Sequence, residues 1–249
     1  MAVGLCVLAF RVGHPVRLSL RHRLRIARIV NEAPGVVSLY VTGRDLAELQ
    51  ARAGQYFRWR FLTPTGWWRT HPFSLSAGLN GQYLRLTVKG VGDDSRSVQG
   101  LHPGTRLGVD GPYGLFTAQR QTRPKVLLIA GGIGITPLRA LLEEIPPKKD
   151  AITLIYRARR WEDVVFRDEL EQLIRDRRGT IHYLVGRRGS AELPDDPLSA
   201  QTLRRLVPDI ESRDVFICGP GPMMQRLQSI LLYIGLPGEQ IHLERFALI

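Results

Sequence analysis

Hydrophobic runs in the first half of the chain are short and are separated by turn residues. Between His22 and Thr117, β-rich runs alternate with Pro-Gly, Pro-Thr-Gly and Asn-Gly segments, and Asn80-Gly81 has the composition of a tight hairpin turn. The predicted strands are residues 24–30, 36–41, 55–61, 84–89 and 106–109. Short strands at regular spacing predict a small antiparallel β-barrel.

After Pro124 the pattern changes to strands that alternate with amphipathic helices. The predicted strands are residues 126–130, 152–156, 181–185, 215–218 and 241–246, and two of the predicted helices are residues 166–175 and 223–234. This alternation predicts a doubly wound, parallel five-stranded α/β domain. With a boundary in the polar segment 119–123, we expect the barrel over residues 21–120 and the α/β domain over residues 121–249.

The most informative stretch is a buried-strand candidate that runs directly into glycines. Residues 131–137, Gly-Gly-Ile-Gly-Ile-Thr-Pro, follow the apolar run 126–130. Thr136 suits a helix N-cap and Pro137 the first helical position, so the stretch predicts a strand, a glycine turn and a helix N-terminus that attracts anions. Pro137 departs from the dinucleotide fingerprint. Taken alone, the stretch fits either a nucleotide site or a plain tight turn.

Arginines follow two of the predicted parallel strands. Ligands of open α/β sheets bind beyond the carboxyl ends of the strands, where this chain has Arg157, Arg159 and Arg160 after one strand and Arg187-Arg188 after the next. Guanidinium groups suit a ribose 2′-phosphate through bidentate contacts. The pattern therefore favours NADPH over NADH.

Composition limits the other classes of site. The chain has a formal net charge of +12 and only two cysteines, Cys6 and Cys218. Two thiols cannot hold an iron–sulfur cluster or a four-cysteine zinc site, and they imply no disulfide framework. We therefore predict no metal site and a reducing compartment.

The N-terminal segment is apolar and then strongly basic. Residues 1–10 are apolar, six arginines lie between positions 11 and 28, and no acidic residue precedes Glu32. Ten residues cannot span a bilayer, and no basic region precedes them as in a signal peptide. We interpret residues 1–20 as a membrane-exit segment whose arginines contact an anionic membrane surface. The alternative is a frayed amphipathic N-terminus. No nucleic-acid partner is expected, because the segment lacks interleaved aromatic residues.

Five motifs occur in an order that identifies a family resemblance. They are Arg69-Thr70-His71-Pro72-Phe73-Ser74-Leu75, Gly111-Pro112-Tyr113-Gly114, residues 131–137, Cys218-Gly219-Pro220 and Glu244-Arg245-Phe246. Together they resemble the ferredoxin–NADP reductase superfamily, and His-Pro-Phe-Ser resembles its ferric reductase and NADPH oxidase branch. The resemblance implies FAD on the barrel and NADPH, or NADH, on the α/β domain.

The resemblance also implies a role for individual residues. Phe73 would lie against the flavin ring, Ser74 would approach flavin N5, and His71 stands where most of the family has a pyrophosphate-binding arginine. Cys218 would help to position the nicotinamide, Phe246 would cover the flavin, and Glu244 resembles the family's C-terminal acid. Gly111-Pro112-Tyr113-Gly114 would be the turn that closes the barrel. A buried inert cysteine and a core phenylalanine are the plainer interpretations of positions 218 and 246.

The cofactor-binding residues that we expect fall into two groups. The flavin group comprises His71, Pro72, Phe73, Ser74, Val88, Lys89, Gly92, Ser95 and Phe246. The nicotinamide nucleotide group comprises Gly131, Gly132, Gly134, Thr136, Pro137, Arg157, Arg187, Arg188, Cys218, Gly219 and Pro220. The catalytic candidates among them, with Glu244 added, are Ser74, Cys218, Glu244 and Phe246.

The function implied is that of an FAD-dependent oxidoreductase that passes hydride from NAD(P)H to FAD and then single electrons to an external acceptor. In the resembling branch the acceptor is heme, so we expect a heme-bearing membrane domain or subunit as partner and a location at the cytoplasmic face of the membrane. One alternative is a free-standing soluble flavin reductase that acts on ferric chelates, quinones or oxygen. Another is a non-catalytic module that binds nucleotides or membranes.

Overall fold

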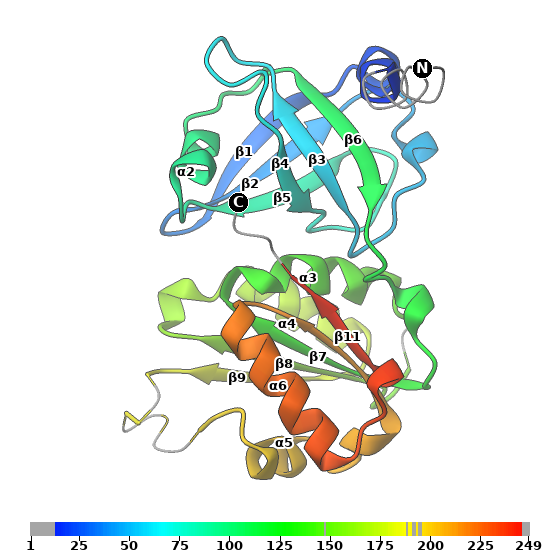
Figure 1. The fold of residues 1–249 in the computed structure, drawn as a ribbon, viewed down its shortest axis with the longest axis vertical. Coiled ribbons are helices and arrows are strands. Elements are labelled where there is room, and N and C mark those ends of the chain that lie inside the picture. The colour runs from blue at the N-terminus through cyan, green and yellow to red at the C-terminus, as the bar shows by residue number, and fades with distance from the viewer. Residues whose placement is uncertain (1–12, 147, 188, 191–192, 194–195, 246–249) are drawn as a thin grey trace, which may run out of the picture. The chain divides into compact units, whose positions relative to one another are not determined.

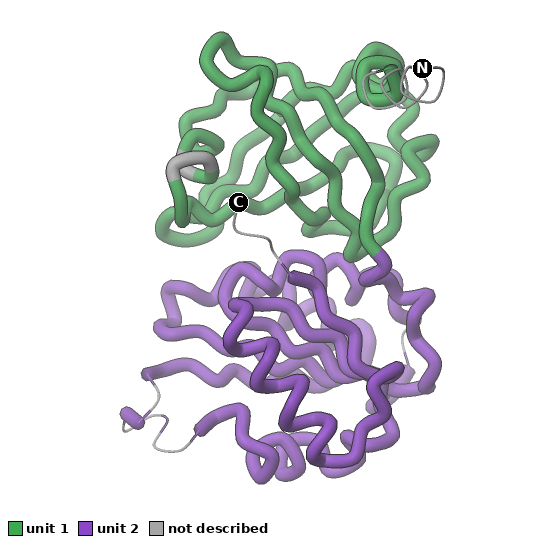
Figure 2. The backbone as a smooth tube through the Cα atoms, viewed as in Figure 1, with its two compact units in different colours: residues 1–114 green, residues 115–249 purple. Residues whose placement is uncertain are grey.

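The chain forms two compact units in a computed structural model. The structure describes residues 13–146, 148–187, 189–190, 193 and 196–245. Unit 1 is Met1–Gly114 and unit 2 is Leu115–Ile249, shown in different colours in Figure 2. The division follows Gly114, whereas the sequence analysis placed it after residue 120. The segment 1–12, which holds most of the predicted membrane-exit segment, lies outside the described residues.

Unit 1 consists of two three-stranded antiparallel sheets, with the orders β1-β2-β5 and β4-β3-β6 (Figure 1). The strands are β1 Arg25–Ala33, β2 Val36–Thr42, β3 Tyr56–Phe61, β4 His71–Ser74, β5 Leu84–Lys89 and β6 Leu107–Tyr113. Isolated bridges between Arg25 and Arg106 and between Leu75 and Leu86 join the two sheets. The predicted antiparallel barrel is confirmed.

Alternation along the strands builds the core of this barrel. Phe57, Trp59 and Phe61 of β3 are buried, whereas Arg58 and Arg60 between them point to the other face. The indole Nε1 of Trp59 donates a hydrogen bond of 3.0 Å to the carbonyl of Phe73, so the large buried ring also fixes β4. Strand β4 itself was not predicted, since four residues that include a proline give no alternation to detect.

Short helices complete unit 1. Residues 13–22 are helical, and α2 spans Asp93–Gln99. The first of these helices packs Leu18 against the barrel core, and the Nδ1 atom of His22 lies 2.8 Å from the carbonyl oxygen of Arg44. Within the residues that the structure describes, no helix has the length and apolar content needed to cross a bilayer.

Unit 2 is a five-stranded parallel sheet in the order β11-β10-β7-β8-β9. The strands are β7 Lys125–Gly131, β8 Ile152–Ala158, β9 Thr180–Val185, β10 Arg213–Cys218 and β11 Ile241–Glu244. The α-helices are α3 Ile135–Glu144, α4 Arg167–Asp176, α5 Ala200–Leu206 and α6 Gly221–Ile234. The 3₁₀ turns of both units are η1 Leu46–Leu49, η2 Ala118–Arg120, η3 Gly132–Gly134, η4 Trp161–Asp163, η5 Ile210–Ser212 and η6 Gly238–Gln240.

The order of the strands creates one switch point. The chain runs outward from central β7 through β8 to β9 and then returns to β10 on the other side of β7. Helices α5 and α6 share a core cluster with β7 and β10 on one face, and α3 and α4 contact each other; Figure 1 shows α6 in front of the sheet with α3 and α4 behind it. The predicted doubly wound sheet is confirmed. Its binding crevice is expected beyond the carboxyl ends of β7 and β10.

A buried carboxylate anchors the entry into this sheet. Asp214 of β10 is fully buried and accepts hydrogen bonds from the backbone N–H groups of Thr122, at 2.7 Å, and Arg123, at 2.5 Å. A charge in the interior is stable only when hydrogen bonds replace its water. This pairing therefore fixes the segment that leads into β7.

Candidate functional site

After the glycine turn that follows β7, the next helix begins two residues earlier than predicted. Helix α3 starts at Ile135 and Gly134 occupies the N-cap position, so Thr136 is not the cap and Pro137 is the third helical residue. The Oγ1 atom of Thr136 instead donates a 3.0 Å hydrogen bond to the carbonyl of Ile133. Pro137 still lies in the first turn, where its missing N–H has no helical partner. The turn and the start of α3 therefore lie at the carboxyl end of β7.

Two glycines of the turn let it approach the segment after β10 without side chains between them. A Cβ atom on Gly134 would lie 2.2 Å from the carbonyl oxygen of Cys218, and one on Gly131 would lie 2.9 Å from Cδ of Pro220. Gly132 differs, because it has φ of +54° and its Cβ would meet nothing within 4 Å. The structure therefore brings the predicted glycines and Cys218-Gly219-Pro220 together at the switch point.

A tyrosine that the sequence analysis missed supports the turn. The hydroxyl of Tyr156 in β8 donates to the carbonyl of Gly132 at 3.1 Å and accepts from the N–H of Val165 at 3.1 Å. Burial raises the pKa of this hydroxyl, so it stays a neutral donor. In the sequence Tyr156 is only the last residue of an apolar run, and nothing there indicates the contact.

Cys218 and Glu244 end neighbouring strands. They are paired in the register of β10 and β11, and Ala130 of β7 lies on the other side of Cys218. Cys218 is fully buried, and burial raises the pKa of its thiol. Burial also raises the pKa of Glu244 to about 7. A neutral thiol can contact a ring but is not a nucleophile. Phe246, the fourth catalytic candidate, lies outside the described residues.

The arginines at this edge of the sheet have different tasks. Arg157 donates to the carbonyls of Leu184, at 2.9 Å, and Gly186, at 2.7 Å, and also to that of Ala158, so its guanidinium joins the ends of β8 and β9. Arg160 pairs with Glu162 and Asp163.

Two other arginines of this edge remain exposed. Among the described residues, Arg159 and Arg187 form no ion pair. Arg188 lies outside the described residues. Among the arginines in the predicted nucleotide group, Arg157, Arg187 and Arg188, Arg187 is therefore the one in the described part of the chain whose guanidinium is available to a ligand.

An aromatic cluster next to these arginines was also missed. The ring centroids of Trp161 and Tyr183 lie 5.6 Å apart, and the guanidinium carbon of Arg167 lies 5.1 Å from the centre of the Trp161 ring. The Tyr183 hydroxyl is buried and has no hydrogen-bond partner among the described residues. The contacts join positions on η4, α4 and β9, so no local sequence signal predicts them.

In unit 1, strand β4 carries the predicted flavin motif. His71 is buried and its ring stacks on that of Phe73, with centroids 5.8 Å apart and an interplanar angle of 3°. Pro72 and Phe73 are partly buried. Ser74 is buried, and its Oγ atom has no hydrogen-bond partner among the described residues. An unpaired buried hydroxyl is unfavourable by about 1–3 kcal/mol, so Ser74 is a strong candidate for a ligand contact.

The second predicted flavin segment forms a closed turn after β5. Val88 and Lys89 end that strand, and Gly92 is the N-cap of α2. The Oγ atom of Ser95 accepts from the N–H groups of Val91, at 2.9 Å, and Gly92, at 3.0 Å. Ser95 thus stabilises the turn from inside the helix and is not the N-cap residue. Its hydroxyl is already used by the backbone.

The Gly-Pro-Tyr-Gly motif is not a turn at its start. Gly111, Pro112 and Tyr113 belong to β6, and Gly114 follows with φ of +99°. Arg58 pairs with Asp110 and its guanidinium lies over the Tyr113 ring, 5.3 Å from the centroid. Pairing with β3 extends the strand through the motif, so the expectation of a simple closing turn was wrong.

Comparison with known proteins gives consistent matches to reductases. Residues 128–229 match the family model described as "Oxidoreductase NAD-binding domain". The flavohemoprotein of Pseudomonas aeruginosa is 32% identical over 232 residues, which cover 90% of this chain and 58% of that protein. The ferredoxin reductase component of 3-ketosteroid-9-alpha-monooxygenase from Mycobacterium tuberculosis is 32% identical over 239 residues, with 90% and 64% coverage. The chain thus spans about three fifths of these relatives.

Solved structures agree in fold. The FAD/NAD-binding domain of nitric oxide dioxygenase from Vibrio cholerae aligns with a TM-score of 0.76 and 25% identity, over 91% of this chain and 99% of that one. A ferredoxin NADP+ reductase from Neisseria gonorrhoeae, solved with bound FAD and NADP, aligns with a TM-score of 0.76 over 89% and 97% of the two chains. At 19% identity the second match supports the fold alone.

The glycine contact at the switch point can be tested by stability. Gly134→Ala would place a methyl group against the Cys218 carbonyl, and we expect it to lower the free energy of unfolding by about 2–3 kcal/mol in urea denaturation. Gly221→Ala is the matched control, because a Cβ there meets nothing within 4 Å, and it should change stability by less than about 1 kcal/mol. Equal stabilities of the two variants would contradict the contact.

The raised pKa of Glu244 predicts a pH dependence. Folding moves this pKa from 4.5 to about 7, so the folded state holds the proton more tightly than the unfolded chain. The resulting stability is complete at low pH and is lost as the pH rises through this interval. Glu244→Gln should remove the loss and raise the free energy of unfolding by about 1–2 kcal/mol near pH 8, since the carboxyl is only partly buried.

Urea denaturation near pH 5 and near pH 8 measures this difference. Glu239→Gln is the control, because the Glu239 side chain is exposed to solvent. The same loss of stability with rising pH in Glu244→Gln and in the unaltered chain would refute the assignment.

Proposed function

Because the chain belongs to the ferredoxin–NADP reductase superfamily, we propose that it is an FAD-dependent NAD(P)H oxidoreductase that delivers single electrons to an external acceptor. The observation that carries this proposal is the meeting of Gly131, Gly134 and Cys218 at the switch point of unit 2. That arrangement suits a nicotinamide nucleotide, and unit 1 carries a separate motif that suits a flavin.

The nucleotide side uses backbone groups more than side chains. The positive end of α3 attracts phosphate, and the preceding turn leaves room at Gly132, where a Cβ atom would meet nothing within 4 Å. The buried Cys218 offers a neutral, polarisable surface beside the turn. Its task is to position the nicotinamide ring. Glu244, with its pKa raised to about 7, can hold or release a proton at its carboxyl near neutral pH.

The residues of β4 fit the flavin that the family uses. FAD, when bound, takes hydride from the nicotinamide and gives up its electrons singly. Ser74 would supply a hydrogen-bond donor from its otherwise unpaired hydroxyl, and the Phe73 ring, held parallel to His71, would offer a flat apolar face. His71 would replace the arginine that most of the family uses near the pyrophosphate.

For the choice of nucleotide we propose NADPH over NADH. Arg187 is exposed at the end of β9 and forms no ion pair with a described residue, and Arg159 is also exposed. A guanidinium that is not engaged elsewhere suits the 2′-phosphate that distinguishes NADPH. Arg157 is a weaker candidate than the sequence indicated, because backbone carbonyls of β8 and β9 already occupy it.

We further propose that the acceptor is heme held by a membrane domain or subunit, as in the ferric reductase and NADPH oxidase branch. Two features support this: the His71-Pro72-Phe73-Ser74 motif and the arginines of the N-terminal segment, which suit an anionic membrane surface. The chain would then work at the cytoplasmic face of the membrane. The related protein of Mycobacterium tuberculosis is likewise named as one component, the ferredoxin reductase, of a monooxygenase.

Spectroscopy tests the reductase proposal. The protein reconstituted with FAD should be yellow and should bleach when NADPH is added without oxygen. Ser74→Ala should slow this bleaching about a hundredfold, because it removes one aligned donor, and should leave NADPH affinity unchanged. Ser229→Ala, an exposed serine on α6, is the control. A colourless protein that binds no FAD would refute the enzyme proposal altogether.

The nucleotide preference has its own test. Arg187→Ala should reduce the ratio of kcat/KM for NADPH to that for NADH by about tenfold or more, because a charged contact to the 2′-phosphate is lost. Arg205→Ala on α5 removes another exposed arginine away from this edge of the sheet and should leave the ratio unchanged. An unchanged ratio in Arg187→Ala would show that the 2′-phosphate does not contact this residue.

A further inference from the structure

The helix at residues 13–22 turns an unusual face to solvent. Pro15 and His22 are buried, and Leu18 packs against the barrel core. Its outer stripe combines two aliphatic residues, Val16 and Leu20, which are 48% and 70% exposed, with Arg17 and Arg21. The outer face of a helix in a soluble protein is normally polar throughout. This face therefore has the mixture of apolar and basic side chains found where helices lie on a membrane.

The loop between β3 and β4 exposes aromatic residues in the same unit. Trp67 and Trp68 are 59% and 55% exposed, their rings pack edge to face with centroids 5.9 Å apart, and Leu62 at the start of the loop is also exposed. The loop is held by backbone hydrogen bonds from Gly66 N–H to the carbonyl of Thr63 and from Arg69 N–H to that of Gly66. Exposing two adjacent indoles on an ordered turn is unfavourable unless a partner covers them.

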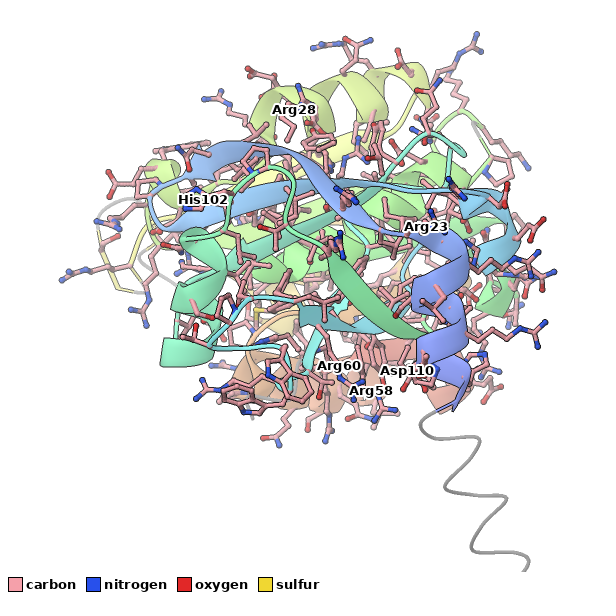
Figure 3. All side chains as sticks on the ribbon, turned by 90° about the horizontal axis from the view of Figure 1, so that it is seen from above. Arg23, Arg28, Arg58, Arg60, His102 and Asp110 are labelled. Atoms are coloured by element: carbon pink, nitrogen blue, oxygen red, sulfur yellow. The ribbon has the colours of Figure 1, made fainter. Side chains whose placement is uncertain are left out.

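These two features belong to one surface. The Nδ1 atom of His14 lies 3.8 Å from the carboxylate of Asp110 in β6, and a Cβ on Gly108 would lie 3.0 Å from Oγ of Ser19 and 3.7 Å from Cβ of Arg60. The helix thus lies over β6 beside the outer face of β3, whose end leads into the loop. Figure 1 shows the helix and the β3–β4 loop at the same end of unit 1. Figure 3, which views that end from above, labels Arg58, Arg60 and Asp110 close to one another near the helix.

The surface carries an excess of positive charge. Two carboxylates beside the helix are already paired, Glu48 with Arg21 and Asp110 with Arg58. Arg17, Arg23 and Arg60 are exposed and form no ion pair with any residue that the structure describes. Basic side chains around exposed apolar ones complement an anionic lipid headgroup layer.

We propose that this surface docks unit 1 on an anionic lipid bilayer, with Trp67 and Trp68 entering the headgroup region and Arg17, Arg23 and Arg60 contacting lipid phosphates. Indoles suit that region because one edge is polar and the rest is apolar. Side chains that project from a turn can enter a fluid headgroup layer directly. A folded acidic protein would have to provide a pocket that matches them. The inference rests on the proposed function at a membrane and adds a membrane-binding surface on the barrel itself.

The position of the anchor has a consequence for the barrel. Thr70 ends the aromatic loop, and the next residue, His71, begins β4. Docking by this loop would therefore place the β4 strand directly behind the contact with the lipid.

Vesicle binding tests the anchor. The full chain, with residues 1–12 present in every variant, is sedimented with vesicles of two parts phosphatidylcholine to one part phosphatidylglycerol. The double variant W67A/W68A should bind at least about tenfold more weakly, because two indoles no longer leave water. Trp161→Ala is the matched control, since Trp161 of unit 2 is 55% exposed, and it should bind as the unaltered chain does.

Fluorescence gives a second readout that does not depend on the N-terminal segment. Lipids brominated near the headgroup should quench the tryptophan fluorescence of the Trp161→Ala variant and should not quench that of W67A/W68A. Arg60→Gln should weaken binding about fivefold at low salt and should have a smaller effect at high salt. Vesicles of phosphatidylcholine alone should bind poorly in every case.

Clear outcomes would overturn the proposal. Equal vesicle binding and equal quenching of W67A/W68A and the unaltered chain would exclude the tryptophans as an anchor. Failure of the unaltered chain to bind anionic vesicles at low salt would also overturn it and would leave the surface to an acidic protein. NAD(P)H-driven bleaching of FAD is measured separately without vesicles, so failure of the proposed enzyme activity is distinguished from failure of the anchor.

Discussion

The candidate nucleotide site depends on one close approach between two backbone segments. Gly134 lies so near the Cys218 carbonyl that no side chain fits between them. This contact requires β7 and β10 to be neighbours and their following segments to diverge, which the strand order β11-β10-β7-β8-β9 provides. The early start of α3 and the hydroxyl bridge from Tyr156 to Gly132 then hold the turn in place. The amides at the helix start are thereby presented by a rigid frame.

The hydrogen-bond partners of polar groups distinguish residues that stabilise the fold from residues that are candidates for ligand binding. Arg157, Thr136, Ser95 and Asp214 resemble functional residues by type, yet each is occupied by nearby backbone groups. Ser74 is different, because its buried hydroxyl has no partner among the described residues. A folded chain tolerates few such groups, so they mark the places where a ligand completes the structure.

Long apolar runs made most of the fold predictable from the sequence. The runs at β7 and β8 are buried on both faces of a parallel sheet and give strong signals, and the glycine turn was recognised because its glycines follow such a run. Strand β4 was missed because it is four residues long and owes its pairing to β3. The backbone contact of Arg157 was not predicted because its acceptor carbonyl comes from β9, which is distant along the chain. Contacts of that kind are products of tertiary structure and leave no local pattern.

The burial of Cys218 bears on how the protein would withstand the proposed flavin chemistry. Reduced flavins that meet oxygen generate peroxide, and peroxide oxidises thiolates far faster than thiols. Because Cys218 is enclosed between β7 and β11 and its pKa is raised, it stays protonated and shielded. A sulfur atom can therefore sit beside the nucleotide turn without becoming a point of oxidative damage or a target for alkylating reagents.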